Sequence, residues 1–159
     1  MGNQISIVQV IQLMLAPGLM ISACGLLLLG MNNKYSLVVN RIRLLNEERR
    51  KFFSKAGERD FQYEENIRLE SISMQLKELT FRVKLVRNAV LSYTVAVAFF
   101  VLTSIFIGVQ YATDSEKLNM VVTVLFLIGM VLVLIGVIFA AYETKKGYDI
   151  IHLEIKVDE

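Results

Sequence analysis

The sequence predicts an all-α integral membrane protein with three transmembrane helices, a cytoplasmic antiparallel helical hairpin made from extensions of spans 1 and 2, and a short strand-like C-terminal tail. The first observation behind this fold class is that 55% of the residues are apolar, above the roughly 45–50% of soluble domains. The second is the distribution of charge. No charged residue precedes Lys34, and none lies between Arg87 and Asp114 or between Lys117 and Glu143. Each uncharged stretch exceeds the ~20 residues that a helix needs to cross a bilayer core of about 30 Å.

The three uncharged stretches are expected to be helices. Lipid offers no partner to the backbone, so only helices and closed barrels cross it, and these stretches lack the alternation of barrel strands. No Lys or Arg precedes the first apolar run, so we interpret it as an uncleaved span with Cys24 buried in it. We place the spans at Ser6–Met31, Ala89–Tyr111 and Leu118–Tyr142. The expected segments are residues 1–31 (transmembrane helix 1), 32–88 (cytoplasmic hairpin), 89–111 (transmembrane helix 2), 112–117 (external loop), 118–142 (transmembrane helix 3) and 143–159 (cytoplasmic tail).

The charge on the connections predicts the orientation. The hairpin segment holds 13 of the 17 basic residues of the chain, whereas the connection between spans 2 and 3 holds only Asp114, Glu116 and Lys117. Lys and Arg in short loops near span ends favour the cytoplasmic side. We therefore expect the N-terminus outside and both the hairpin and the C-terminus in the cytoplasm.

Within the hairpin, apolar residues recur at alternating steps of three and four, which is the spacing of a coiled-coil seam. A break is expected at Ser54–Asp60, where Gly57 interrupts a polar run. The seam residues are Val38, Ile42 and Leu45 before the break and Leu69, Ile72, Leu76, Leu79, Val83 and Val86 after it. A second apolar set lies off the seam and consists of Leu37, Leu44, Phe53, Ile67, Met74 and Phe81. A bundle between copies of the chain would cover the second set, and contact with the membrane surface or the tail is the alternative.

Small residues mark the faces on which the spans are expected to pack, because they let helices approach closely in lipid. These residues are Gly18, Ser22, Gly25, Gly129, Gly136 and Ala140. Pro17 is expected to kink span 1. Gln9 and Gln12 share a face near the outer end of span 1. They form either polar rings at the mouth of an oligomeric pore or interhelical hydrogen bonds.

Basic residues beside the spans are the candidates for contact with lipid headgroups. They are Lys34, Arg41 and Arg43 near span 1 and Arg82, Lys84 and Arg87 near span 2. Nucleic acid is not an expected partner, because the basic residues alternate with acids and lie next to the membrane. The expected partners are membrane lipid and other copies of the chain.

The tail from Ile151 to Asp158 alternates apolar and polar residues, which predicts a half-buried strand after a helix that Gly147 ends. His152 is the only histidine, and the chain has a single cysteine, so no metal site and no cofactor are expected. An enzyme is not expected either, because catalytic motifs are absent from the sequence. No span holds an Asp, Glu, Lys, Arg or His residue, which argues against ion-coupled transport.

Three motifs carry a resemblance to a family of small bacterial membrane proteins catalogued as a domain of unknown function. They are Ile11-Gln12-Leu13-Met14-Leu15-Ala16-Pro17-Gly18, Asn40-Arg41-Ile42-Arg43-Leu44 and Arg82-Val83-Lys84-Leu85-Val86-Arg87-Asn88-Ala89. The resemblance covers roughly residues 5–142 and leaves the tail outside. It implies a bacterial inner-membrane protein with three spans and implies no reaction.

Two functions remain open at this point. The first is a homo-oligomeric membrane assembly that forms a passive channel or pore, lined by span 1. The alternative is a structural or regulatory membrane scaffold whose cytoplasmic helical hairpin docks an unidentified cytoplasmic protein.

Overall fold

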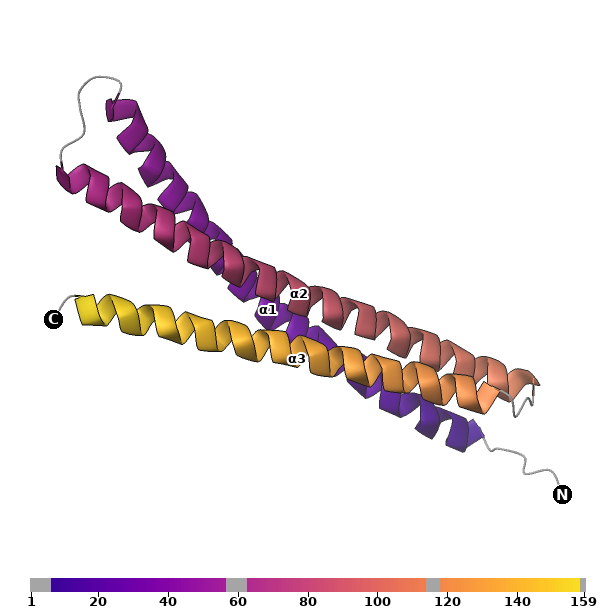
Figure 1. Ribbon diagram of the computed structural model, residues 1–159. Coiled ribbons are helices and arrows are strands. Elements are labelled where there is room, and N and C mark those ends of the chain that lie inside the picture. Colours follow the sequence, from indigo (N-terminus) through magenta and orange to yellow (C-terminus); the bar gives the residue numbers. More distant parts are fainter. Residues whose placement is uncertain (1–6, 57–62, 114–117, 158–159) are drawn as a thin grey trace. The chain divides into compact units, whose positions relative to one another are not determined.

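Three long α-helices make up the part of the protein that the computed structural model describes. They are α1 (Ile7–Ala56), α2 (Tyr63–Thr113) and α3 (Leu118–Val157) (Figure 1). The structure describes residues 7–56, 63–113 and 118–157, with side chains in 7–54, 63, 65–113 and 118–147. Across these residues no strand occurs, so the all-helical prediction is confirmed for the spans and the hairpin segment.

Each helix is longer than a membrane crossing requires. The helices contain 50, 51 and 40 residues, and a helix rises about 1.5 Å per residue, so about 20 residues cross the hydrocarbon core. All three are long and apolar enough to span a membrane. Spans 1 and 2 therefore continue as helix well beyond a bilayer, as predicted. Most of the predicted break at Ser54–Asp60 and of the external loop at 112–117 lies outside the described residues.

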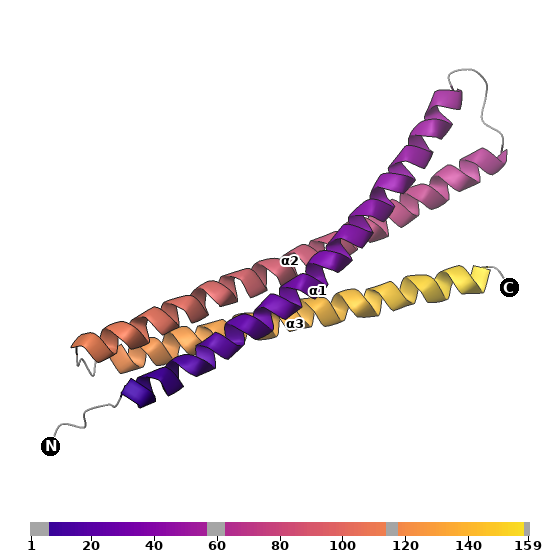
Figure 2. The same cartoon turned by 180° about the vertical axis from the view of Figure 1, so that it is seen from behind.

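The chain divides into two units, and each helix contributes to both. The first unit contains Met1–Met31 and Asn88–Phe139, and the second contains Asn32–Arg87 and Ala140–Glu159. The divisions fall within three residues of the ends that the charge pattern assigns to the spans. Figure 2 shows α1 from behind as one uninterrupted ribbon.

The core of the first unit is formed by small and aromatic residues from all three helices. Cys24 of α1 and Ala96 and Phe100 of α2 are fully buried at its centre, so the expected burial of Cys24 is confirmed. Phe126 of α3 packs on Phe100 with ring centroids 5.5 Å apart. Burial along α2 follows steps of three and four, at Ala89, Tyr93, Ala96, Phe100, Thr103 and Ile107. The apolar spacing of the hairpin segment thus continues through the second span.

Buried positions along α1 follow a strict repeat. Pro17, Cys24, Met31, Val38 and Leu45 are all buried and lie seven residues apart. A seven-residue repeat keeps one face of a helix toward its neighbours over many turns. Pro17 lies inside α1, which is helical on both sides of it. The kink expected there stays a prediction.

The tail departs from the prediction. The strand expected at Ile151–Asp158 is wrong, because α3 continues as helix to Val157. Gly147 does not end the helix either. A lone strand leaves its backbone N–H and C=O groups without partners, whereas an extension of an existing helix satisfies them internally and needs no new nucleus. The apolar residues also suit a helix, since Ile151 and Ile155 lie four apart, as do Leu153 and Val157.

In the second unit, the residues of the predicted seam are the less exposed apolar residues of α1 and α2. Val38, Leu45, Ile72 and Val86 are buried, and the other seam residues are half-buried. The off-seam apolar set is exposed throughout, at Leu37, Leu44, Phe53, Ile67, Met74 and Phe81. An ion pair also joins the two helices, since Arg68 Nε donates to Glu48 Oε1 at 2.8 Å.

Candidate functional site

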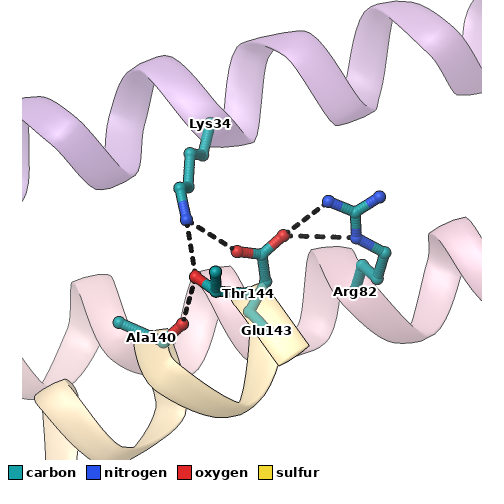
Figure 3. A network of polar contacts seen from close by, with 5 residues as sticks. All are labelled: Lys34, Arg82, Ala140, Glu143 and Thr144. Atoms are coloured by element: carbon teal, nitrogen blue, oxygen red, sulfur yellow. Dashed lines mark hydrogen bonds and ion pairs between the residues drawn. The ribbon is translucent and has the colours of Figure 1, made fainter. Parts of the chain in front are cut away.

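A buried carboxylate in the second unit is held by cations from the two other helices. The side chain of Glu143 on α3 is only 1% exposed. Lys34 Nζ of α1 lies 3.0 Å from Glu143 Oε2. Arg82 of α2 donates to Glu143 Oε1 through Nη2 at 2.7 Å and through Nε at 3.2 Å (Figure 3). One cluster thereby links α1, α2 and α3.

Neighbouring groups on α3 complete this cluster. The Lys34 ammonium also donates to Thr144 Oγ1 at 2.9 Å, and this hydroxyl donates to the carbonyl of Ala140 at 3.0 Å (Figure 3). Gly147, one turn after Glu143, provides space for the Arg82 side chain, since a Cβ there would lie 2.9 Å from Arg82 Nη2. This close approach explains a glycine within the helix, at a position where the sequence predicts that the helix ends.

The position of the cluster follows from the charge pattern. Lys34 and Glu143 are the first charged residues after the first and third uncharged stretches, and Arg82 lies seven residues before the span beginning at Ala89. Consecutive spans run in opposite directions. The end of span 1, the start of span 2 and the end of span 3 are therefore expected at similar depth. Burial of an unpaired carboxylate costs several kcal/mol, so both oxygens need charged or hydrogen-bonding partners. Here both have them.

In this cluster, ion pairs and hydrogen bonds hold α1, α2 and α3 together. Each carboxylate oxygen accepts a hydrogen bond from a cation. Within the described residues, no group of three or more His, Cys, Asp or Glu side chains could hold a metal ion.

The residues expected on the packing faces divide into two groups. Gly129 and Gly136 of α3 are buried against Phe100 and Tyr93 of α2, where an added Cβ would lie 2.7 Å and 2.5 Å from the rings. On α1, Gly18 and Gly25 are exposed and have open space around them, as does Gly30. Ser22 is also exposed, and its hydroxyl donates to the carbonyl of Gly18 at 3.3 Å. Ala140 is half-buried.

Gln9 and Gln12 both lie exposed on α1. At roughly 100° per residue, α1 presents three faces about 90–140° apart. Its buried face carries Pro17, Cys24 and Met31, a second face carries Gly18, Ser22 and Gly25, and a third carries Gln9 and Gln12. The glutamines and the small residues therefore do not share a face.

The expected headgroup residues are also divided. Lys34 and Arg82 are engaged with Glu143, whereas Arg41, Arg43, Lys84 and Arg87 are exposed. Sequence reasoning missed the Glu143 cluster, because its members lie 61 and 109 residues apart along the chain. The sequence feature that points to the cluster is that Lys34 and Glu143 are each the first charged residue after an uncharged stretch.

The fold and the cluster define a class: a protein of three long apolar helices fastened together by a buried ion-pair cluster beside the segments able to span a membrane. The chain belongs to the family described as "Protein of unknown function (DUF2721)", which matches residues 14–153. The match begins after Leu13 and extends through most of the tail, further than the resemblance had indicated. No curated protein and no solved structure matches the chain.

Proposed function

We propose that the chain is a bacterial inner-membrane protein with three spans that assembles with copies of itself around a passive pore. The observation that carries this proposal is the arrangement of α1. Its Gly18, Ser22 and Gly25 face is left open by the rest of the described chain, and two glutamines lie exposed on another face. A lone chain would present both faces to lipid.

The three faces of α1 suit a ring of subunits. The buried face packs within its own chain, and the small-residue face allows a helix of a neighbouring copy to approach closely. The third face then points to the axis of the ring. Ala16, Ala23 and Gly30 follow Gln9 on this face at steps of seven residues and are all exposed, so small side chains continue the lining.

The charge distribution supports the orientation of this assembly. Basic residues concentrate in 32–88. By the positive-inside rule this favours a cytoplasmic position for that segment, and with it a position of Gln9 and Gln12 at the outer mouth. A ring of amides would supply hydrogen bonds to permeating water and ions without selecting strongly by charge.

Two measurements test this proposal in sequence. Native mass spectrometry in detergent is expected to give one dominant oligomer, and a monomer at every concentration would refute self-assembly. Planar-bilayer recordings are then expected to show conductance that falls in the Gln9→Leu/Gln12→Leu variant. Thr123→Val, which removes an exposed hydroxyl from the outer half of α3, is the matched control and should conduct as the natural chain does. An oligomer without conductance under voltage or tension would refute the pore.

The second candidate is a scaffold that docks a soluble protein on the second unit. The exposed off-seam apolar residues favour it, because Leu37, Leu44 and Met74 present large side chains on a segment expected outside the membrane. A Leu37→Gln/Leu44→Gln/Met74→Gln variant separates the candidates. Loss of the oligomer in this variant would show that the surface serves self-assembly. An unchanged oligomer would support docking of a soluble partner on it.

A further inference from the structure

A groove lies on the second unit between α2 and α3. Its volume is about 690 Å³, and its lining includes Lys77, Phe81 and Lys84 of α2 and Tyr142 and Lys146 of α3. We infer that this groove binds the headgroup and first acyl carbons of an anionic phospholipid. The inference requires a membrane-embedded chain but neither an oligomer nor a pore, so it and the proposed pore can fail separately.

The charge of the groove fits an anion. Three lysines line it and one acid, Glu78, opposes them. None of the three ammonium groups pairs with another described side chain, in contrast to Lys34 and Arg82, which Glu143 neutralises. Ser73 adds a hydroxyl to the lining that can donate to a remaining oxygen of a phosphate ester, whereas the Thr80 hydroxyl already donates to the carbonyl of Leu76 at 2.7 Å.

The apolar part of the lining favours a lipid over a free anion. Phe81, Tyr142 and Leu76 lie among the lysines. Lysine stems and aromatic rings of this kind are the usual surroundings of an acyl chain at the point where it meets its headgroup. Inorganic phosphate would use the ammonium groups alone and would leave these side chains in water.

The depth of the groove also matches a headgroup. Tyr142 is the last residue of the third expected span, and Lys84 lies five residues before the second. The contact between Arg82 and Glu143 sets α2 and α3 side by side at this level, so Lys84 and Lys146 lie close to the expected membrane surface. Lys77 lies seven residues before Lys84 on α2, about 10 Å away from it at 1.5 Å per residue. Basic pockets between helices at the cytoplasmic surface are suited to anionic headgroups.

The binding test uses the whole chain in detergent micelles containing phosphatidylglycerol or phosphatidylcholine, with retained lipid counted by native mass spectrometry. We expect retention of phosphatidylglycerol over phosphatidylcholine, and a loss of about 10- to 100-fold in Lys77→Gln/Lys84→Gln/Lys146→Gln. The matched control, Arg49→Gln/Arg50→Gln/Lys51→Gln, removes the same charge from an exposed part of α1 and should retain the lipid. No preference in the natural chain, or an equal loss in the control, would overturn the inference.

A second measurement does not depend on the folding of the lysine variant. The chain has no tryptophan, so Phe81→Trp places a single tryptophan, which can be excited selectively over tyrosine, in the groove. Brominated phosphatidylglycerol should quench it more strongly than brominated phosphatidylcholine, and inorganic phosphate should not displace the quencher at equal concentration. Equal quenching by both lipids would overturn the inference, and displacement by phosphate would assign the groove to a free anion instead.

Discussion

At the scale of single residues, Glu143 is the charged side chain that is buried among the residues that the structure describes. A carboxylate with 1% of its surface exposed has lost nearly all of its hydration, and the fold replaces this with three hydrogen bonds from Lys34 and Arg82. The two cations remain partly exposed. Removal of the acid would therefore leave two half-buried positive charges facing each other across the site.

Glu143→Gln is expected to lower the free energy of unfolding by about 3 kcal/mol, because it removes the only negative charge of the cluster while both cations stay. The measurement is unfolding in mixed micelles followed by circular dichroism. Glu48→Gln is the matched control. Its ion pair with Arg68 is solvent-exposed, so the expected loss there is below about 1 kcal/mol.

A rescue variant identifies the charge as the cause. Glu143→Gln combined with Lys34→Met and Arg82→Met replaces the cluster with side chains that need no counter-charge, and should recover most of the lost stability. A loss that persists in this triple variant would contradict the electrostatic account.

The glycines give a second prediction at this scale. Gly136→Ala should destabilise the chain by about 1–3 kcal/mol, because the new methyl group would meet the buried ring of Tyr93 at 2.5 Å. Gly18→Ala is the control, since nothing lies within 4 Å of its added Cβ. In dilute detergent its unfolding midpoint should not fall. Equal losses at both positions would show that the open face of α1 is covered.

At the scale of elements, the seam residues and the off-seam apolar residues of the second unit differ in exposure. In the sequence, only their spacing distinguishes them. Ile72 is fully buried and Met74, two residues on, is 65% exposed. The alternation of three and four identifies which face of α2 is turned toward α1, because only residues at that spacing stay on one face over several turns.

Ile72→Ala should therefore cost about 2–5 kcal/mol of stability through the cavity it leaves. Met74→Ala removes a similar volume from an exposed position and should change stability by less than about 0.5 kcal/mol in monomeric chain. Limited proteolysis provides the measurement, with faster cleavage within α2 expected in the Ile72 variant only. Equal cleavage rates would contradict the assignment of the faces.

The tail shows where the spacing of apolar residues does not predict the correct secondary structure. Eight alternating residues satisfy the period of a strand, but the same residues place apolar pairs four apart, and a short segment does not separate the two periods. The deciding factor is the preceding part of α3, which begins at Leu118 and already supplies the partners of the first backbone groups. The pattern of apolar and polar residues in the tail does not reveal that a preceding helix can extend into it.

At the scale of the whole molecule, the distribution of charge was enough to predict three long helices and their order. Charged residues near three span ends meet at Glu143. No local sequence pattern predicts that these side chains touch, because the contact depends on how the helices rotate about their axes. The same holds for Gly147, whose role became clear only once Arg82 was placed beside it.

The orientation of the molecule is tested with single cysteines. Replacement of Cys24 by Ala removes the only native thiol. In that background, a membrane-impermeant maleimide applied to intact spheroplasts should label Thr113→Cys, which lies beside the expected external loop. Lys51→Cys should be labelled only after permeabilisation. Labelling of position 51 in intact spheroplasts would refute the orientation that the basic residues predict.

The assignment of the charges in the cluster has a consequence for biosynthesis. Lys34 and Arg82 leave the ribosome before Glu143, so the first two helices must enter the bilayer while their two cations still lack a counter-ion. The ion-pair cluster can form only when the third helix emerges. A protein truncated before residue 143 would therefore be expected to present two uncompensated positive charges to cellular quality control.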